Sequence, residues 1–203
     1  MPTSSKNPRV KRNHDLKHRF KDSELRHETL DSLLADFENR CGYSMLHVED
    51  ASRHNMEVDH FDPTIGGAAR NDYFNLIPAY SQCNNAKRRT WPPRKDTRQR
   101  YLNPTKESDY GVHIFEDAAT GELLPISEEG VYQIENCALN SKFLRMKRRE
   151  RTEDVEIIAQ QKRISALHGD PHRLIEAAQP IIDRLRNRHI PIIPPPPPGI
   201  RIL

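Results

Sequence analysis

Apolar residues between positions 23 and 42 recur at spacings of three to five, which is typical of one face of an amphipathic helix. The residues on this face are Leu25, Leu30, Leu33, Leu34 and Phe37. Asp22 or Ser23 can cap the start of this helix, and Cys41-Gly42 lies near its expected end. Residues 1–21 are polar and basic without an apolar period, so we expect an arm before the helix that is flexible unless bound.

Residues 111–124 alternate between apolar and polar side chains on both sides of Ala118-Ala119-Thr120-Gly121. This alternation around a turn predicts a β-hairpin, and Val131-Tyr132-Gln133-Ile134 is a candidate third strand. A helical pattern follows, from a cap at Asn140 or Ser141 to about Leu167.

The last part of the chain is dominated by proline. Asp170-Pro171 predicts the start of a final helix, which Pro180 should kink. Residues 191–198 contain six prolines and predict an extended, polyproline-like tail. Docking on a partner, solvation and packing on the chain itself remain alternatives for this tail.

These patterns predict an α+β fold in which helices dominate and the sheets are small. We expect four segments: the basic arm over 1–21, a core over 22–100, the hairpin and C-terminal helices over 101–189 packed on that core, and the tail over 190–203.

Composition narrows the class of protein. The chain has 203 residues, of which 35% are hydrophobic and 30% are charged. No stretch approaches the roughly 20 consecutive apolar residues of a membrane-spanning helix. Three scattered cysteines are too few for a disulfide framework. We therefore expect a soluble, cytoplasmic protein with no membrane partner.

The net charge of +3 results from blocks of opposite sign. Basic residues are concentrated in 1–21, 87–100 and 142–151, whereas acidic residues dominate 22–59 and 105–139. A basic stretch alone is often only a solvated surface. Three such stretches around one segment rich in His, Asn and Asp instead favour a nucleic-acid partner.

That segment contains an ordered set of polar groups. Asp59-His60 is followed by the Gly66-Gly67 loop, then by Asn75-Leu76, and finally by Cys83-Asn84 with Lys87 three residues later. A single Asp-His dipeptide carries little information, since the chain has 10 histidines. The order and spacing of the whole set carry the signal.

Over about residues 41–92 the set resembles the HNH endonuclease family, which has a ββα-metal finger, here in a His-Asn-Asn variant. The resemblance implies a metal-dependent hydrolase that cleaves phosphodiester bonds. Histidine titrates near neutral pH, so His60 is suited to act as the general base toward water. Asp59 and Asn84 offer the oxygen ligands that Mg²⁺ prefers, with Mn²⁺ or Ni²⁺ as alternatives.

The resemblance gives the remaining site residues supporting roles. Asn75 would hold the loop and so position His60. Lys87, Arg88 and Arg89 follow the metal ligand on the expected helix and would bind flanking phosphates. DNA is the expected substrate, with RNA as the alternative.

The chain departs from the many HNH proteins that bind a structural zinc through two Cys-x-x-Cys pairs. The corresponding segments here are Cys41-Gly42-Tyr43-Ser44 and Tyr80-Ser81-Gln82-Cys83, so each lacks one thiol. Only His47 or His54 could complete four ligands. We expect no structural zinc, with Cys41 and Cys83 packed near each other, and Cys137 buried behind the hairpin.

Beyond residue 92 a weaker resemblance points to bacterial HNH proteins that act with an ATPase in antiviral defence, as in Septu-type systems. It rests on Trp91-Pro92, Tyr101-Leu102-Asn103-Pro104, Asp109-Tyr110-Gly111 and Ala138-Leu139-Asn140. The chain has no phosphate-binding Gly-x-x-x-x-Gly-Lys segment, so ATP use would belong to a partner. Two alternatives stay open: a non-catalytic nucleic-acid-binding subunit, and an adaptor built on the proline tail.

Overall fold

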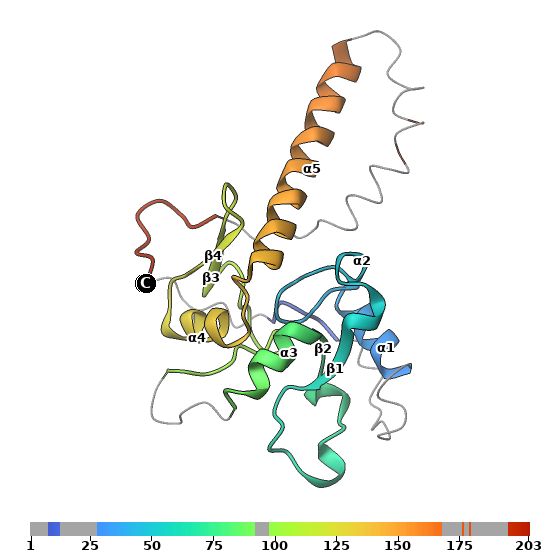
Figure 1. Cartoon of the computed structure of the whole chain (residues 1–203), viewed down its shortest axis with the longest axis vertical. Coiled ribbons are helices and arrows are strands. Elements are labelled where there is room, and N and C mark those ends of the chain that lie inside the picture. The colour runs from blue at the N-terminus through green and yellow to red at the C-terminus, as the bar shows by residue number, and fades with distance from the viewer. Residues whose placement is uncertain (1–7, 13–27, 92–97, 168–175, 177–178, 180–194) are drawn as a thin grey trace.

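The computed structural model describes residues 8–12, 28–91, 98–167, 176, 179 and 195–203. Within these ranges the fold combines helices with two small antiparallel sheets, which confirms the α+β class (Figure 1). The elements are α1 (Glu28–Asp36), α2 (Val48–Ala51), β1 (Met56–His60), β2 (Leu76–Tyr80), α3 (Ser81–Arg88), β3 (Ile114–Asp117), β4 (Glu122–Pro125), α4 (Glu128–Asn136) and α5 (Lys142–Leu167).

The first sheet pairs β1 with β2, and α3 starts directly after β2. The register places Met56 opposite Tyr80 and His60 opposite Leu76. Both α1 and α3 contact the two strands, so the sheet lies between helices that are distant in sequence. The chain between β1 and β2 forms a loop that extends away from the body (Figure 1).

The first predicted helix is present as α1, but it ends at Asp36, before the expected Cys41-Gly42. Glu38 and Asn39 have positive φ angles of 53° and 58°, which end the helix and turn the chain toward Cys41. The expected cap at Asp22 or Ser23 lies outside the described residues.

The described part of the basic arm is packed against the body, contrary to the expected flexibility. Arg9 donates from Nε to Asp109 Oδ1 at 2.6 Å and from Nη2 to the Gly42 carbonyl at 2.6 Å. Arg12 donates to the Leu76 carbonyl at 2.5 Å and is only 6% exposed. These arginines have buried acceptors, so residues 8–12 belong to the folded unit.

The predicted hairpin is confirmed: β3 pairs with β4, from Ile114 opposite Pro125 to Asp117 opposite Glu122. The predicted third strand over 131–134 is wrong, because these residues lie in α4. The Ser127 side chain caps this helix by accepting from Gly130 N–H. Two glutamates in its first turn favour the helix through its dipole.

The long helix is confirmed as α5, whose Ser141 hydroxyl accepts from Leu144 N–H at 3.5 Å. It projects from the body in Figure 1. The final helix falls mostly outside the described residues, and Glu176 and Gln179 are helical. In the described end of the tail, Leu203 N–H donates to the Pro125 carbonyl at 3.0 Å, while the Ile202 and Leu203 side chains are exposed.

One hydrophobic cluster connects the described parts of the chain. It contains Val10 from the arm, Leu30 and Leu34 from α1, Ile77 and Ala79 from β2, Ile114 and Leu123 from the hairpin, Ile134 from α4, and Leu144 from α5. No helix in the described ranges has the length and apolarity to cross a bilayer. The cluster packs β1 and α3 against the later elements and thereby holds the candidate site in place.

Candidate functional site

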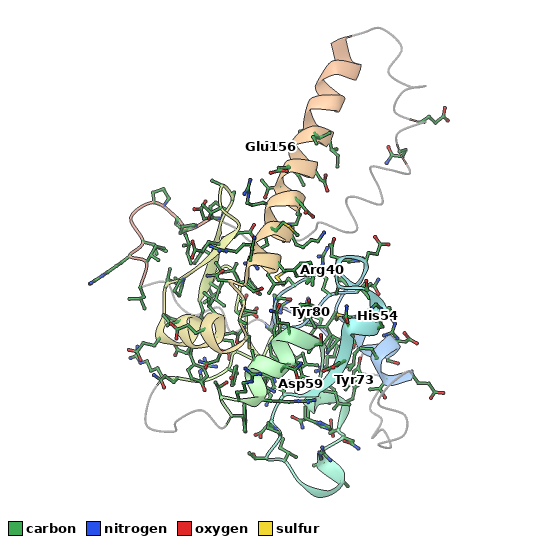
Figure 2. The ribbon with its side chains drawn as sticks, viewed as in Figure 1. Arg40, His54, Asp59, Tyr73, Tyr80 and Glu156 are labelled. Atoms are coloured by element: carbon green, nitrogen blue, oxygen red, sulfur yellow. The ribbon has the colours of Figure 1, made fainter. Side chains whose placement is uncertain are left out.

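Asp59 lies in a buried ion pair near the end of β1. Its Oδ2 accepts from Lys87 Nζ at 2.6 Å and from the Tyr43 hydroxyl at 2.5 Å. Asp59 is 7% exposed and Lys87 2% exposed. In Figure 2 the label of Asp59 lies close to α3, the helix that carries Lys87. Burial, and then the Asp59 charge, raise the pKa of Tyr43 well above its usual range, so Tyr43 stays a hydrogen-bond donor.

Lys87 has an aromatic surrounding as well as its carboxylate partner. Its Nζ lies 5.2 to 5.9 Å from the ring centroids of four aromatic residues, Tyr43, Phe61, Trp91 and Tyr101. It also donates to the His60 carbonyl at 2.9 Å. The role expected for Lys87 as a surface phosphate ligand therefore needs correction, because its ammonium group is used in the interior. Arg88 and Arg89 are exposed at the end of α3, so the prediction that they bind phosphates stands for these two residues.

Asn84 is fully buried on α3, and Glu57 of β1 holds its amide. Its Nδ2 donates to Glu57 Oε2 at 2.7 Å. Its Oδ1 is buried without a hydrogen-bond partner in the part of the chain that the structure describes. A buried acceptor without a partner is costly and calls for a ligand or an ordered water.

His60 is half-buried at the end of β1. Its Nε2 lies 2.8 Å from Asn71 Oδ1 in the following loop. An amide oxygen at this position favours a proton on Nε2 and leaves the lone pair on Nδ1, the arrangement of a base that accepts through Nδ1. No hydrogen bond within the described residues joins the His60 ring to Asp59 or Asn84, so the site residues are neighbours along β1 and α3 without forming one hydrogen-bonded group.

Asn75 closes the loop between β1 and β2. Its Nδ2 donates to the carbonyls of Asp62 at 3.2 Å and Arg70 at 3.0 Å, and its Oδ1 accepts from Asp62 N–H at 3.0 Å. Asn75 also accepts through its own carbonyl from Phe61 N–H at 2.8 Å. These bonds tie both ends of the loop together directly after His60, which is the geometry that a loop-holding role requires.

Cys41 and Cys83 lie close together, as expected, and both are fully buried. Cys41 Sγ accepts from the backbone N–H groups of Tyr43, Ser44 and Tyr80 at 3.4, 3.4 and 3.2 Å. Burial opposes ionisation of Cys41, but hydrogen bonds from Cys83, Ser44 and the backbone outweigh it and lower its pKa to about 6. The thiol pair thus anchors the turn at 41–44 to the start of α3. Cys137 is also buried.

The site contains oxygen donors of the kind that a hard cation prefers. Glu57 and Asp59 are two residues apart on β1 and therefore lie on the same face of the strand. Glu57 accepts from Asn84 and Asp59 accepts from Lys87, both on α3, and the Asn84 amide oxygen is the donor atom without a partner in the described chain. Within the described residues there is no group of three or more His, Cys, Asp or Glu side chains placed to share a metal, so the amide would be a necessary ligand. Metal binding at Asp59 Oδ2 would require Lys87 to move away.

Sequence reasoning missed three residues of this site. Glu57 had a usable signal, since it precedes Asp59 by two positions on a strand and so shares its face. Tyr43 occupies one of the positions between Cys41 and Ser44 and had only its neighbourhood as a signal. Asn71 lies in an irregular loop, where no periodicity places it.

Comparison with protein-family models, with curated proteins and with solved structures returned no match for this chain.

Proposed function

We propose that the chain is a metal-dependent endonuclease of the HNH type that hydrolyses phosphodiester bonds, with DNA as the preferred substrate and RNA as the alternative. The observation that carries the proposal is the buried Asn84 oxygen without a partner, held by Glu57 beside the strand of Asp59 and His60. The succession β1, β2, α3 supports it, because this is the element order of a ββα-metal finger.

In this mechanism His60 accepts a proton from the attacking water through Nδ1, while Asn71 holds the ring through Nε2. Asn75 keeps the loop closed, so the ring has one orientation. Arg88 and Arg89 bind the phosphates that flank the cleaved bond.

Asp59 and Asn84 would hold a divalent cation, with Mg²⁺ preferred and Mn²⁺ or Ni²⁺ as alternatives. When bound, the cation supplies charge neutralisation at the scissile phosphate. A cation held at Oδ2 would have to displace the Lys87 ammonium group, which donates to this carboxylate oxygen. In the structure, the ammonium group of Lys87 pairs with the Asp59 carboxylate.

The test replaces His60 by Ala and measures cleavage of supercoiled plasmid with a series of divalent cations. His60→Ala should lose cleavage by at least about a hundredfold, because general-base catalysis contributes on this scale. Its affinity for DNA should be unchanged. His54→Ala is the matched control, since His54 is an exposed histidine on the turn before β1. Equal cleavage by His60→Ala and wild type would contradict the mechanism.

A second candidate is a non-catalytic nucleic-acid-binding subunit of a complex with an ATPase. The buried Lys87–Asp59 ion pair favours it, because a carboxylate that is already neutralised can serve as scaffold alone. Binding of DNA without cleavage, with every cation and with the ATPase partner present, would support this candidate over the nuclease.

A further inference from the structure

A second polar region lies away from β1, between the 40–50 segment and the first turns of α5. Here a cavity of about 20 Å³ is lined by His47 and by four cationic side chains, Arg40, Lys147, Arg148 and Arg151, with Asp50 as its single acidic side chain. In Figure 2 the label of Arg40 lies close to the base of α5. We call this space the α5 cavity.

Two buried arginines of the α5 cavity have nitrogens without partners. Arg148 is 4% exposed; its Nε donates to the Gly121 carbonyl at 2.5 Å and its Nη2 to the Leu139 carbonyl at 2.8 Å. Its Nη1 is buried and has no hydrogen-bond partner in the described chain. Arg151 is 6% exposed, and its Nη2 donates to Glu116, while its buried Nε has no partner in the same ranges.

Aromatic packing does not compensate these nitrogens. Arg12 also has unpaired nitrogens, but the rings of Tyr73 and Phe37 lie 4.8 and 5.4 Å from its guanidinium carbon. No ring of the described residues lies over Arg148 or Arg151. A guanidinium N–H that is buried without an acceptor carries a full desolvation penalty, so these two groups require an acceptor.

The charges around the α5 cavity also favour a negative ligand. Glu116 pairs with Arg151, and Lys147 Nζ lies 2.7 Å from Glu150 Oε2 and 3.7 Å from Asp50 Oδ1. The four cationic side chains of the cavity therefore face three carboxylates, and one positive charge remains in excess. Burial first, and then the neighbouring Arg151 charge, lower the pKa of Arg40 to about 10. An anion in the cavity would relieve this repulsion between like charges.

We propose that the α5 cavity binds an oxyanion of the phosphate class, whose oxygens accept from Arg148 Nη1 and Arg151 Nε. A volume of about 20 Å³ holds a group slightly larger than one water, which suits one or two phosphate oxygens. Guanidinium groups prefer oxyanions because their N–H groups point in fixed directions. Lys147, with 21% of its side chain exposed, lies where the ion would meet solvent. This site is separate from Asp59 and does not depend on nuclease activity.

The test measures the thermal midpoint of unfolding of the full chain while phosphate replaces chloride at constant ionic strength. An ion that binds only the native state raises this midpoint in a saturable way. Lys147→Met should weaken the apparent phosphate affinity roughly tenfold, because it removes one charged partner. Lys142→Met is the matched control: it removes the same charge from an exposed position of the same helix, outside the cavity.

A second variant tests the buried arginine directly. The pair Arg151→Met with Glu116→Gln removes both partners of the ion pair together, so neither partner is left as an unpaired buried charge, and it should abolish the phosphate effect. The proposal is overturned if phosphate and chloride act alike, or if Lys147→Met and Lys142→Met respond equally to phosphate. Either result would mean that the α5 cavity holds water and not an oxyanion.

A further arm distinguishes a free ion from the end of a nucleic-acid strand. A short DNA strand with a 5′-phosphate and the same strand with a 5′-hydroxyl are compared as competitors of inorganic phosphate, using His60→Ala protein so that neither strand is cut. Competition by the phosphorylated strand alone, lost in Lys147→Met, assigns the cavity to strand ends. Phosphate binding without such competition assigns it to the free ion.

Discussion

Lys87 shows how burial decides the role of a basic residue. In the sequence it is the first of three consecutive basic residues, which together suggest phosphate binding. In the structure Arg88 and Arg89 point to solvent, whereas Lys87 returns toward β1 and pairs with Asp59. A helix presents every third or fourth residue to the same face, so Lys87 shares the inner face with Asn84.

Removal of one partner of the Lys87–Asp59 pair should be strongly destabilising. Lys87→Met leaves a carboxylate buried without its counter-charge, and we expect a loss of about 3–5 kcal/mol in the free energy of unfolding. Chemical denaturation measures this loss. Lys87→Met combined with Asp59→Asn should recover part of it, because the uncompensated charge is gone.

The matched control for this experiment is Arg88→Met, which removes a charge from the exposed neighbour on the same helix. We expect its effect to stay within about 0.5 kcal/mol. If Lys87→Met were as mild as Arg88→Met, the ion pair would not be a structural contact in solution.

At the scale of elements, the hairpin and α5 are joined at one turn. Gly121 lies between β3 and β4 with a φ angle of 68°, and a Cβ at this position would lie 2.4 Å from the Arg145 carbonyl of α5. Its own carbonyl accepts from Arg148 Nε at 2.5 Å. The turn therefore needs glycine both for its backbone conformation and for its close approach to the helix.

Three glycine substitutions separate these two requirements. Gly121→Ala should lose more than about 2 kcal/mol in the free energy of unfolding, because it adds a clash to a strained φ. Gly67→Ala, at a φ of 62° with open space around the Cβ, should lose about 1 kcal/mol. Gly66→Ala has neither problem and should be neutral. Urea denaturation orders the three variants, and equal losses at Gly121 and Gly67 would exclude the contact with α5.

At the scale of the whole molecule, the basic blocks do not act only as a surface for a polyanion. Arg9 and Arg12 from the arm, Lys87 from the middle block, and Arg148 and Arg151 from α5 have buried or part-buried side chains that bind carbonyls and carboxylates. Part of the positive charge therefore holds distant segments together, and only the exposed remainder would contribute to the proposed nucleic-acid surface.

The exposed remainder can be tested through the salt dependence of DNA binding. Each phosphate contact contributes about 0.9 to the slope of log affinity against log salt concentration. Arg89→Ala should remove about one phosphate contact, so the slope should fall by about 0.9. It should also weaken binding equally for all sequences. Arg201→Ala, in the described end of the tail, is the control and should leave the slope unchanged. Identical slopes for both variants would remove Arg89 from the interface.

Much of the local structure could be predicted. The hairpin and α5 were expected at nearly their observed bounds, because alternation, a turn and a capping serine act within a few residues. The 131–134 segment was missed because a short apolar run fits a strand or a helix equally well. The cap at Ser127 and two following glutamates decided for the helix.

The candidate site was predicted less completely. The sequence by itself determined the order of Asp59, His60, Asn75 and Asn84 along the chain, and it favoured a strand for the first two and a helix after Cys83. The loop-holding role of Asn75 came from the family resemblance, and the structure supplies the contacts that this role requires. Only the tertiary structure decided that Lys87 neutralises Asp59, that Glu57 holds Asn84, and that buried arginines of α5 surround a cavity. Such pairings join residues far apart in the chain, and the common core selects them. A buried charge is costly unless it is paired, so burial selects these partners, and local sequence patterns do not show which residues they are.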